Sequence, residues 1–183
     1  MLALGTELPR FTLPDVRTGN AVSTEDFEGT PVLVMFICNH CPYVKLIQAG
    51  LAELGRDYQG RRLAILGVAP NDASSHPEDR PEELAAKADE LGFTFPVLYD
   101  ESQDIARSLT AACTPDFFLF DSQHRLAYRG QFDDARPQNG LPVTGESLRT
   151  ALEQVLAGSD VPADQRPSMG CSIKWRAEPL SIS

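Results

Sequence analysis

Two cysteines separated by two residues directly follow an apolar run, and this junction constrains the fold more than any other feature of the chain. Residues 32–37 are continuously apolar, which is typical of a strand covered on both faces of a sheet. After the cysteines the hydrophobic period becomes helical, with apolar side chains at Val44, Ile47, Leu51 and Leu54. Pro42 suits the first turn of this helix and Gly55 suits its end. We therefore predict that Cys38 and Cys41 lie at a strand-to-helix junction, on the first turn of the helix.

The rest of the chain alternates between strand and helix patterns. Segments at 63–68, 95–100, 117–120 and 126–132 predict four further strands, the last two joined as a hairpin. Helical patterns begin at Pro81, near residues 100–102, and at Leu148; Gly92 ends the first and Gly158 ends the last. This order predicts an α/β fold in which a central mixed β-sheet is flanked by helices on both faces. At 183 residues we expect a single domain.

Composition and charge narrow the classes of partner and compartment. The net charge of −10 argues against nucleic acid and anionic membranes as partners, because both are polyanions. The first residues carry no basic and apolar signal pattern, and no apolar stretch approaches the ~18 residues of a membrane-spanning helix. We expect a cytoplasmic protein. In a reducing cytoplasm, a Cys-x-x-Cys pair is more often catalytic or metal-binding than a permanent disulfide.

The position of the two cysteines favours thiol chemistry. Unpaired N–H groups and the positive end of the helix dipole stabilise a thiolate, which is the nucleophilic form of cysteine. A second sulfur two residues away can displace whatever the first one captures. His40, inside the motif, adds positive charge when protonated. We expect Cys38, as the sulfur nearer the helix start and the more exposed one, to attack, and Cys41 to resolve.

A zinc site is the main structural alternative for this pair. Zinc takes four ligands, usually from two paired motifs, and the other cysteines, Cys113 and Cys171, are single and far apart in sequence. Haem attachment requires histidine after the second cysteine, where this chain has Pro42. The redox interpretation is therefore preferred, and we expect no metal and no other bound cofactor.

Several motifs together resemble the thioredoxin superfamily. The strand–Cys-x-x-Cys–helix unit is similar to its active-site motif, and CTPDFFLFD is similar to its second signature, in which a cis-proline faces the dithiol. The opening segment and the GCSIKW tail resemble peroxiredoxin-like proteins of the AhpC/TSA branch. The resemblance implies a thioredoxin-like fold with an N-terminal extension (1–30), a β/α insertion before the cis-proline loop and a docking tail (159–183). It also implies that Thr114 and Pro115 line the substrate groove.

The chain departs from both family patterns. The motif reads ICNHC, without the tryptophan and Gly-Pro of thioredoxin, and Val32 stands where thioredoxin has a buried acid. Proton transfer to the second thiol therefore needs another group, such as His40 or water. If Cys41 takes the peroxidatic place of a peroxiredoxin, Cys38 replaces its threonine and Val34 its proline. This substitution favours dithiol–disulfide exchange over peroxide reduction.

The other two cysteines have two interpretations each. Cys113 suits core packing, because free cysteine is among the most buried residue types, but the resemblance places it near the dithiol. Cys171 lies in a tail with apolar residues that must pack somewhere. Either the tail only covers an apolar patch, or Cys171 is a third redox cysteine that pairs with Cys38 or Cys113.

The histidines and the acidic loop are expected to be simpler. We expect His40 to face solvent and modulate the pKa of a thiol, and His76 and His124 to be loop residues. The acidic loop 71–83 is interpreted as a solvated face, with a substrate-gating lid as the alternative.

These features predict a thiol–disulfide oxidoreductase that uses a Cys38–Cys41 couple. Its substrate would be a disulfide or oxidised thiol on a protein or small molecule, and a thioredoxin- or glutathione-type system would regenerate the dithiol. One alternative is a peroxidase in which Cys41 attacks peroxide and Cys38 or Cys171 resolves the sulfenic acid. Another is a non-catalytic redox-sensing module.

Overall fold

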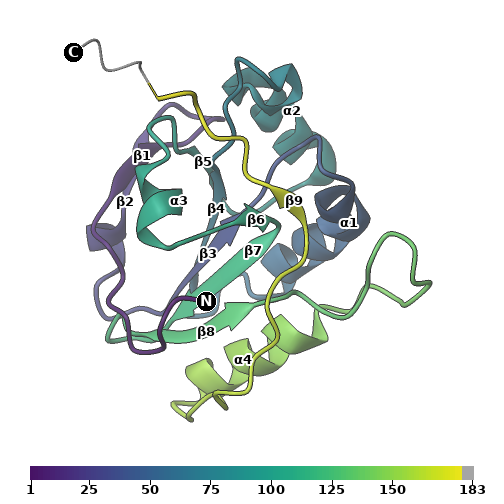
Figure 1. Ribbon diagram of the computed structural model, residues 1–183. Helices are drawn as coiled ribbons and strands as arrows, with labels where there is room; N and C mark the ends of the chain where they lie inside the picture. Colours follow the sequence, from purple (N-terminus) through teal and green to yellow (C-terminus); the bar gives the residue numbers. More distant parts are fainter. Residues whose placement is uncertain (179–183) are drawn as a thin grey trace.

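A five-stranded mixed sheet forms the centre of the molecule (Figure 1). The computed structural model describes residues 1–178. The strand order is β5 (Val97–Tyr99), β4 (Ala64–Ala69), β3 (Val32–Phe36), β7 (Asp116–Phe120) and β8 (Leu126–Gly130). β3, β4 and β5 are parallel, whereas β7 is antiparallel to both β3 and β8. The predicted central mixed sheet and the β7–β8 hairpin are therefore confirmed.

Each face of the sheet has its own hydrophobic core. Leu33 and Met35 of β3 belong to one core, and Val32, Val34 and Phe36 belong to the other. Because successive side chains of a strand point to opposite faces, a strand buried on both sides must be apolar at every position. This explains the continuous apolar run before the cysteines.

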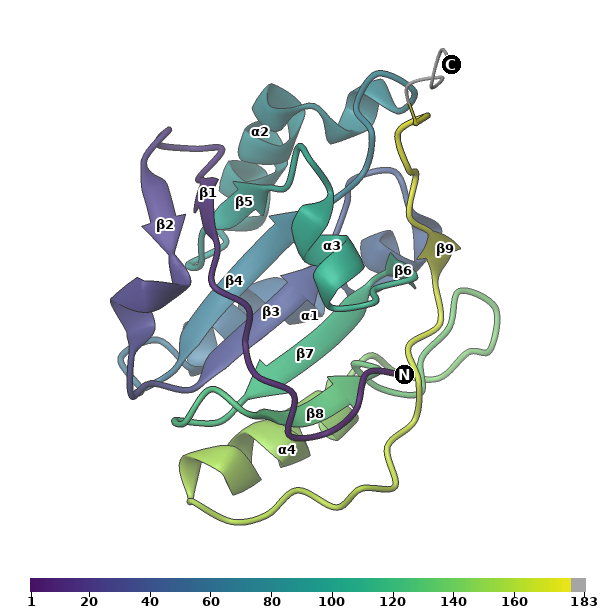
Figure 2. The same ribbon diagram turned by 60° about the vertical axis from the view of Figure 1, so that its left-hand side comes forward.

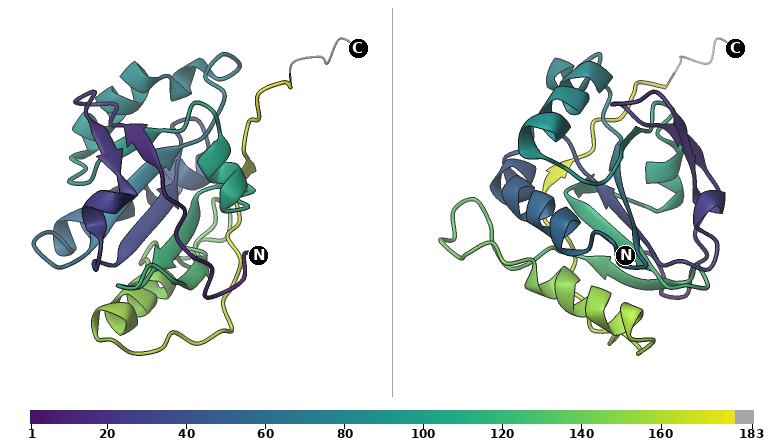
Figure 3. Two further views of the ribbon diagram at one scale, coloured as in Figure 1. Left: turned by 90° about the vertical axis from the view of Figure 1, so that its left-hand side faces the viewer. Right: turned by 180° about the vertical axis from the view of Figure 1, so that it is seen from behind.

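Helices cover both faces, as predicted (Figure 3). α1 (Pro42–Asp57), α2 (Pro81–Leu91) and α4 (Glu146–Leu156) pack on one face. α3 (Asp104–Ser108) packs on the other, together with the N-terminal segment. Two short 3-10 helices, η1 (Thr24–Phe27) and η2 (Pro77–Asp79), complete the helical elements of the described chain. No described helix is long and apolar enough to cross a membrane.

Two glycines at helix ends behave differently from each other. Gly92 ends α2 in the left-handed conformation (φ 68°), as predicted, because glycine adopts this geometry without a steric penalty. Gly55 does not end α1, which continues to Asp57, so this prediction is wrong. A Cβ on Gly55 would lie 2.7 Å from the Thr94 Oγ1 atom. Gly55 therefore permits close packing of the helix rather than its termination.

Two small sheets flank the central one. β1 (Thr12–Pro14) and β2 (Ala21–Ser23) form a hairpin within the N-terminal region, which the sequence patterns did not indicate. β6 (Cys113–Thr114) pairs with β9 (Cys171–Ser172) near the other end of the chain. The tail leaves α4, runs past β8 and reaches β6 (Figure 2). Of the tail expected at 159–183, residues 179–183 lie outside the described residues.

Candidate active site at the β3–α1 junction

The two cysteines of the motif lie at the junction between β3 and α1. Cys41 is the N-cap of α1, and Pro42 is its first residue. Cys38 lies in the connecting loop, so the prediction that both cysteines belong to the first turn is wrong for Cys38. The reason is Pro42, since the residue before a proline is kept extended and the helix cannot begin earlier.

Both sulfurs converge on one residue of the opposite loop. The Cys38 Sγ atom lies 3.1 Å from the Thr114 hydroxyl, and the Cys41 Sγ atom lies 3.3 Å from the Thr114 carbonyl oxygen. The Thr114–Pro115 peptide bond is cis. Cys38 is 4% exposed and Cys41 is fully buried, and both are free thiols. Cys38 is thus the more exposed of the two, as expected, although both cysteines are buried.

The environment favours ionisation of Cys41 over Cys38. A hydrogen bond from the Cys38 thiol, interactions with Cys171 and the backbone N–H of Val44 lower the pKa of Cys41 to about 4, against the opposing effect of burial. The interaction with Cys41, burial and the charge of Asp79 raise the pKa of Cys38. The Val44 N–H is one of the unpaired donors of the first helical turn, so the helix start acts on Cys41. The surroundings of the pair therefore favour the thiolate on Cys41 and the thiol on Cys38.

A buried carboxyl group from the acidic loop orients the residues between the cysteines. Asp79 accepts hydrogen bonds from the Asn39 N–H (2.7 Å) and the Asn71 amide (3.0 Å), and its Oδ2 atom lies 2.5 Å from the His40 Nδ1 atom. The side chain of Asp79 is 1% exposed and that of His40 is 16% exposed. A solvated Asp79 and a solvent-facing His40 were both predicted, and both predictions are wrong.

The hydrogen bonds of His40 leave one ring nitrogen open. Since a carboxylate only accepts, the proton of a neutral His40 lies on Nδ1, which faces Asp79. The Nε2 atom is buried and has no hydrogen-bond partner among the described residues. A His40 nitrogen, the Cys38 sulfur and an Asp79 oxygen all lie within 4.8 Å of one another. His40 thus lies near the Cys38 sulfur, with Nδ1 turned to Asp79 and Nε2 without a partner among the described residues.

The same three groups are the donors that a metal would meet. A structural zinc site takes four protein ligands, whereas this cluster supplies three in the described part of the chain. Asp79 already serves three donors of the loop. The cluster is better suited to hold the loop in place than to hold an ion.

The remaining cysteines lie on the neighbouring loop and tail. Cys171 is directly opposite Thr114 in the β6–β9 ladder, and Cys113 is opposite Ser172. Burial raises the pKa of Cys113 to about 12 and that of Cys171 to about 11. Both are partly exposed. The structure therefore brings Cys171 to the dithiol, whereas Cys113 contacts the Pro115 carbonyl at 3.7 Å.

The other histidines and the acidic loop have structural roles. The His124 Nε2 atom lies 3.0 Å from the carbonyl oxygens of both Phe27 and Thr30, which ties the β7–β8 turn to the N-terminal region. His76 packs beside His40, with ring centroids 4.5 Å apart. No local pattern separates Asp79 from its acidic neighbours, so its role could not be predicted from sequence.

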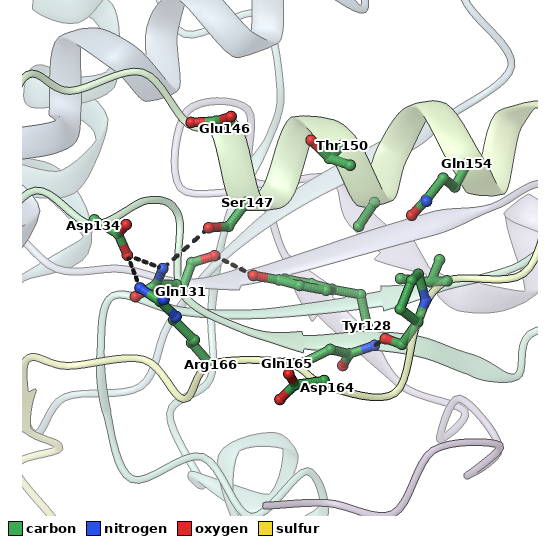
Figure 4. Close-up of a pocket in the computed structure, with 13 residues that line it drawn as sticks. Tyr128, Gln131, Asp134, Glu146, Ser147, Thr150, Gln154, Asp164, Gln165 and Arg166 are labelled. Atoms are coloured by element: carbon green, nitrogen blue, oxygen red, sulfur yellow. Dashed lines mark hydrogen bonds and ion pairs between the residues drawn. The ribbon is translucent and has the colours of Figure 1, made fainter.

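A polar pocket lies elsewhere, between α4, β8 and the tail (Figure 4). Its volume is about 390 Å³, and its walls carry no cysteine. Figure 4 shows Gln131 and Arg166 bound to Asp134 across one end. The donor–acceptor distances are 2.7 Å for Gln131 and 2.8 Å for Arg166. Tail residues from the segment 161–166 form one wall of this pocket, and no redox group lines it.

Fold and site together define a protein with a thioredoxin-like fold and a dithiol facing a cis-proline loop. The model of the AhpC/TSA family matches residues 4–129, and the chain belongs to this family. A Mycobacterium tuberculosis protein that is provisionally named a peroxiredoxin is 32% identical over 105 residues, which span 57% of this chain and 61% of that protein.

Solved structures extend the similarity to the whole fold. An uncharacterized conserved protein from Geobacillus kaustophilus is 49% identical, with a TM-score of 0.94 over 98% of this chain and 95% of that one. A Chlorobium tepidum protein provisionally named a thiol:disulfide interchange protein is 19% identical, with a TM-score of 0.65 over 85% of this chain and 99% of that one. The latter likeness concerns the fold alone.

Proposed function

We propose that the protein is a thiol–disulfide oxidoreductase in which Cys38 and Cys41 alternate between a dithiol and a disulfide. The observation that carries this proposal is the convergence of both sulfurs on Thr114, at 3.1 and 3.3 Å, beside a cis-proline. Membership of the AhpC/TSA family supports a redox role of the thioredoxin or peroxiredoxin type.

The proposed order of attack is the reverse of the one expected from sequence. Cys41, as the thiolate, attacks one sulfur of a substrate disulfide, forms a mixed disulfide and expels the other sulfur as a thiolate. Cys38 then loses its proton and attacks the Cys41 sulfur. The Cys38–Cys41 bond forms, the substrate leaves as its second thiolate, and the substrate has gained two electrons.

His40 is proposed to take the proton of Cys38 in the second step. Its Nε2 atom has a free lone pair when Nδ1 carries the proton, and Asp79 holds the ring. The His40–Asp79 pair would replace the buried acid of thioredoxin, whose position is occupied by Val32 in this chain. Asp79 is a positioning residue, because it contacts the loop and the imidazole rather than the sulfurs.

Burial of both sulfurs limits which reactants reach them directly. While the tail is seated, a small disulfide or an oxidised small thiol fits this access better than a folded protein. We propose that a thioredoxin- or glutathione-type system in the cytoplasm returns the disulfide to the reduced pair, which takes two electrons and, with Cys41 as a thiolate, one proton.

Peroxide reduction is the second candidate, and the buried Cys41 thiolate favours it. Peroxide is small enough to reach a sealed sulfur, and a thiolate converts it to an alcohol or water while becoming a sulfenic acid. Cys38 would then condense with that sulfenic acid and release water. The Thr114 hydroxyl, 3.1 Å from the Cys38 sulfur, places one hydroxyl beside the couple although position 38 lacks the threonine of peroxiredoxins.

Turnover of a small disulfide and of peroxide by matched variants tests both candidates. Cys41→Ser should abolish both activities, Cys38→Ser should block disulfide closure with Cys38, and Cys113→Ser is the matched control that should behave as wild type. The Cys38→Ser/Cys171→Ser double variant should accumulate a mixed disulfide on Cys41. Retained turnover in Cys41→Ser would overturn the proposal, and peroxide consumption no faster than that of free cysteine would remove the second candidate.

A further inference from the structure

The tail strand β9 places a third cysteine against the dithiol. In an antiparallel ladder, directly opposite residues project their side chains to the same face, with Cβ atoms roughly 5 Å apart. Thr114 is opposite Cys171, and the Thr114 side chain reaches the Cys38 sulfur. Cys113, one position earlier on β6, projects to the other face. Cys171 therefore lies on the dithiol side of the ladder and Cys113 does not.

Gly170 brings the tail unusually close to this loop. A Cβ on Gly170 would lie 2.0 Å from the Thr114 carbonyl oxygen, which is the oxygen that the Cys41 sulfur contacts. Only glycine permits this approach. The tail backbone and the Cys41 sulfur thus meet at one carbonyl group.

Anchors on both sides fix β9 in this position. Before it, Gln165 is buried and hydrogen-bonds the Ala127 carbonyl (2.9 Å) and the Arg129 N–H (3.1 Å) of β8. After it, Ile173 is buried in the core on the α3 face, and the Lys174 N–H donates to Asn71, which also binds Asp79. The strand is held at the site rather than lying loosely over it.

We propose that Cys171 is a third redox cysteine, which exchanges into the Cys38–Cys41 disulfide and forms a Cys41–Cys171 disulfide. This inference rests on the proposed function of the Cys38–Cys41 couple. The Cys171 thiolate attacks the Cys41 sulfur, the Cys38–Cys41 bond breaks, and Cys38 leaves as a thiolate and takes up a proton. No electrons are gained or lost in this step, because one disulfide replaces another.

The exchange moves the disulfide to a sulfur that a larger reactant can reach. Cys38 and Cys41 are buried, whereas Cys171 is partly exposed. An external dithiol can attack the Cys171 sulfur and expel Cys41 as a thiolate. Of Cys41 and Cys171, Cys41 is the better leaving group, since interactions with Cys38 and Cys171 favour its ionised form. The pairing is the one that the sequence suggested only for the peroxidase alternative, and it differs from the pairings with Cys38 or Cys113 suggested for a third redox cysteine.

Disulfide mapping of the full-length protein tests the pairing. The protein is oxidised with a stoichiometric amount of the thiol oxidant diamide, quenched in acid, alkylated and mapped by mass spectrometry. In Cys38→Ser, Cys41–Cys171 should form in most molecules, because an internal thiol competes at roughly millimolar or higher effective concentration. Cys38→Ser/Cys113→Ser, the matched control, should give the same result. A Cys38→Ser protein with Cys41 oxidised and Cys171 free would overturn the proposal.

Two further measurements test the position of β9 and the exchange step separately. Gly170→Val keeps Cys171 but pushes β9 from Thr114, and in the Cys38→Ser background it should slow Cys41–Cys171 formation at least about tenfold. The second measurement compares two reduction rates of the oxidised protein, one with a protein dithiol and one with a small phosphine. The ratio of the first rate to the second should be about tenfold lower in Cys171→Ser than in wild type. An unchanged ratio would overturn the exchange step.

The outcomes separate this inference from the proposed function. If Cys38–Cys41 forms in the wild type but Cys41–Cys171 forms in neither wild type nor Cys38→Ser, only the inference fails. If Cys41 remains a free thiol throughout, the proposed function fails as well.

Discussion

The ionisation of Cys41 determines how the reduction potential of the couple should depend on pH. With a pKa of about 4, Cys41 at pH 7 lies about three units above its pKa, and the reduced state gains roughly 4 kcal/mol from ionisation. For a two-electron couple this corresponds to a potential about 90 mV more oxidising than that of the same dithiol with ordinary thiols. Between about pH 5 and 8 only one proton is taken up, so the potential should fall by about 30 mV per pH unit rather than about 59.

Removing the strongest stabilising contact tests the cause of this shift. Cys38→Ala deletes the thiol whose hydrogen bond contributes most to the low pKa of Cys41, so that pKa should rise. The ultraviolet absorbance of the thiolate, followed across pH in wild type, Cys38→Ala and Cys41→Ser, measures it directly. Cys113→Ser is the matched control and should titrate as wild type. A wild-type midpoint near the ordinary value of about 8.5, or a slope of about 59 mV per pH unit, would refute the reasoning.

Three other predictions concern stability. Burial raises the pKa of Asp116 to about 6, so the folded state holds this proton more tightly than the unfolded state and loses stability as pH rises from about 4 to 6. Asp116→Asn should therefore raise the free energy of unfolding in urea by up to about 3 kcal/mol at pH 8 and leave it unchanged near pH 3.5. An equal gain at both pH values would contradict this. Asp79→Ala leaves the donors around it, including that of His40, unpaired and should cost about 3 kcal/mol in the same assay, so a loss below about 1 kcal/mol would argue against a structural network. Gly55→Ala should destabilise the protein by about 1–3 kcal/mol despite better helix propensity, because its Cβ would lie 3.0 Å from Phe95; a higher melting temperature would oppose this.

The elements that a local pattern specifies were predictable from sequence. The run 32–37 is apolar at every position because both faces of β3 are covered, and Gly92 ends α2 because its backbone is left-handed. The strand–Cys-x-x-Cys–helix junction follows from the same change of period. These features depend on residues within a few positions of one another.

The features that sequence did not predict depend on long-range contacts. Asp79 is one of several acids in its loop, and only the fold brings it to the residues between the cysteines. Cys171 is opposite Thr114 because of a ladder between strands that lie far apart in sequence. The order of attack proposed above differs from the one expected from sequence for a local reason, since Pro42 delays the helix and leaves Cys41, not Cys38, at its start.

The N-terminal region and the tail also cover parts of both margins of the central sheet. Along β8, Gly5 and Thr6 pair with Leu126, and Arg166 accepts from the Gln131 N–H just beyond the strand. At the other margin, the Val16 N–H donates to Val97 of β5. Exposed backbone groups at a sheet margin invite a strand from another molecule and thereby aggregation. The segments that wrap this sheet occupy those groups, which should keep the folded protein dispersed at high concentration.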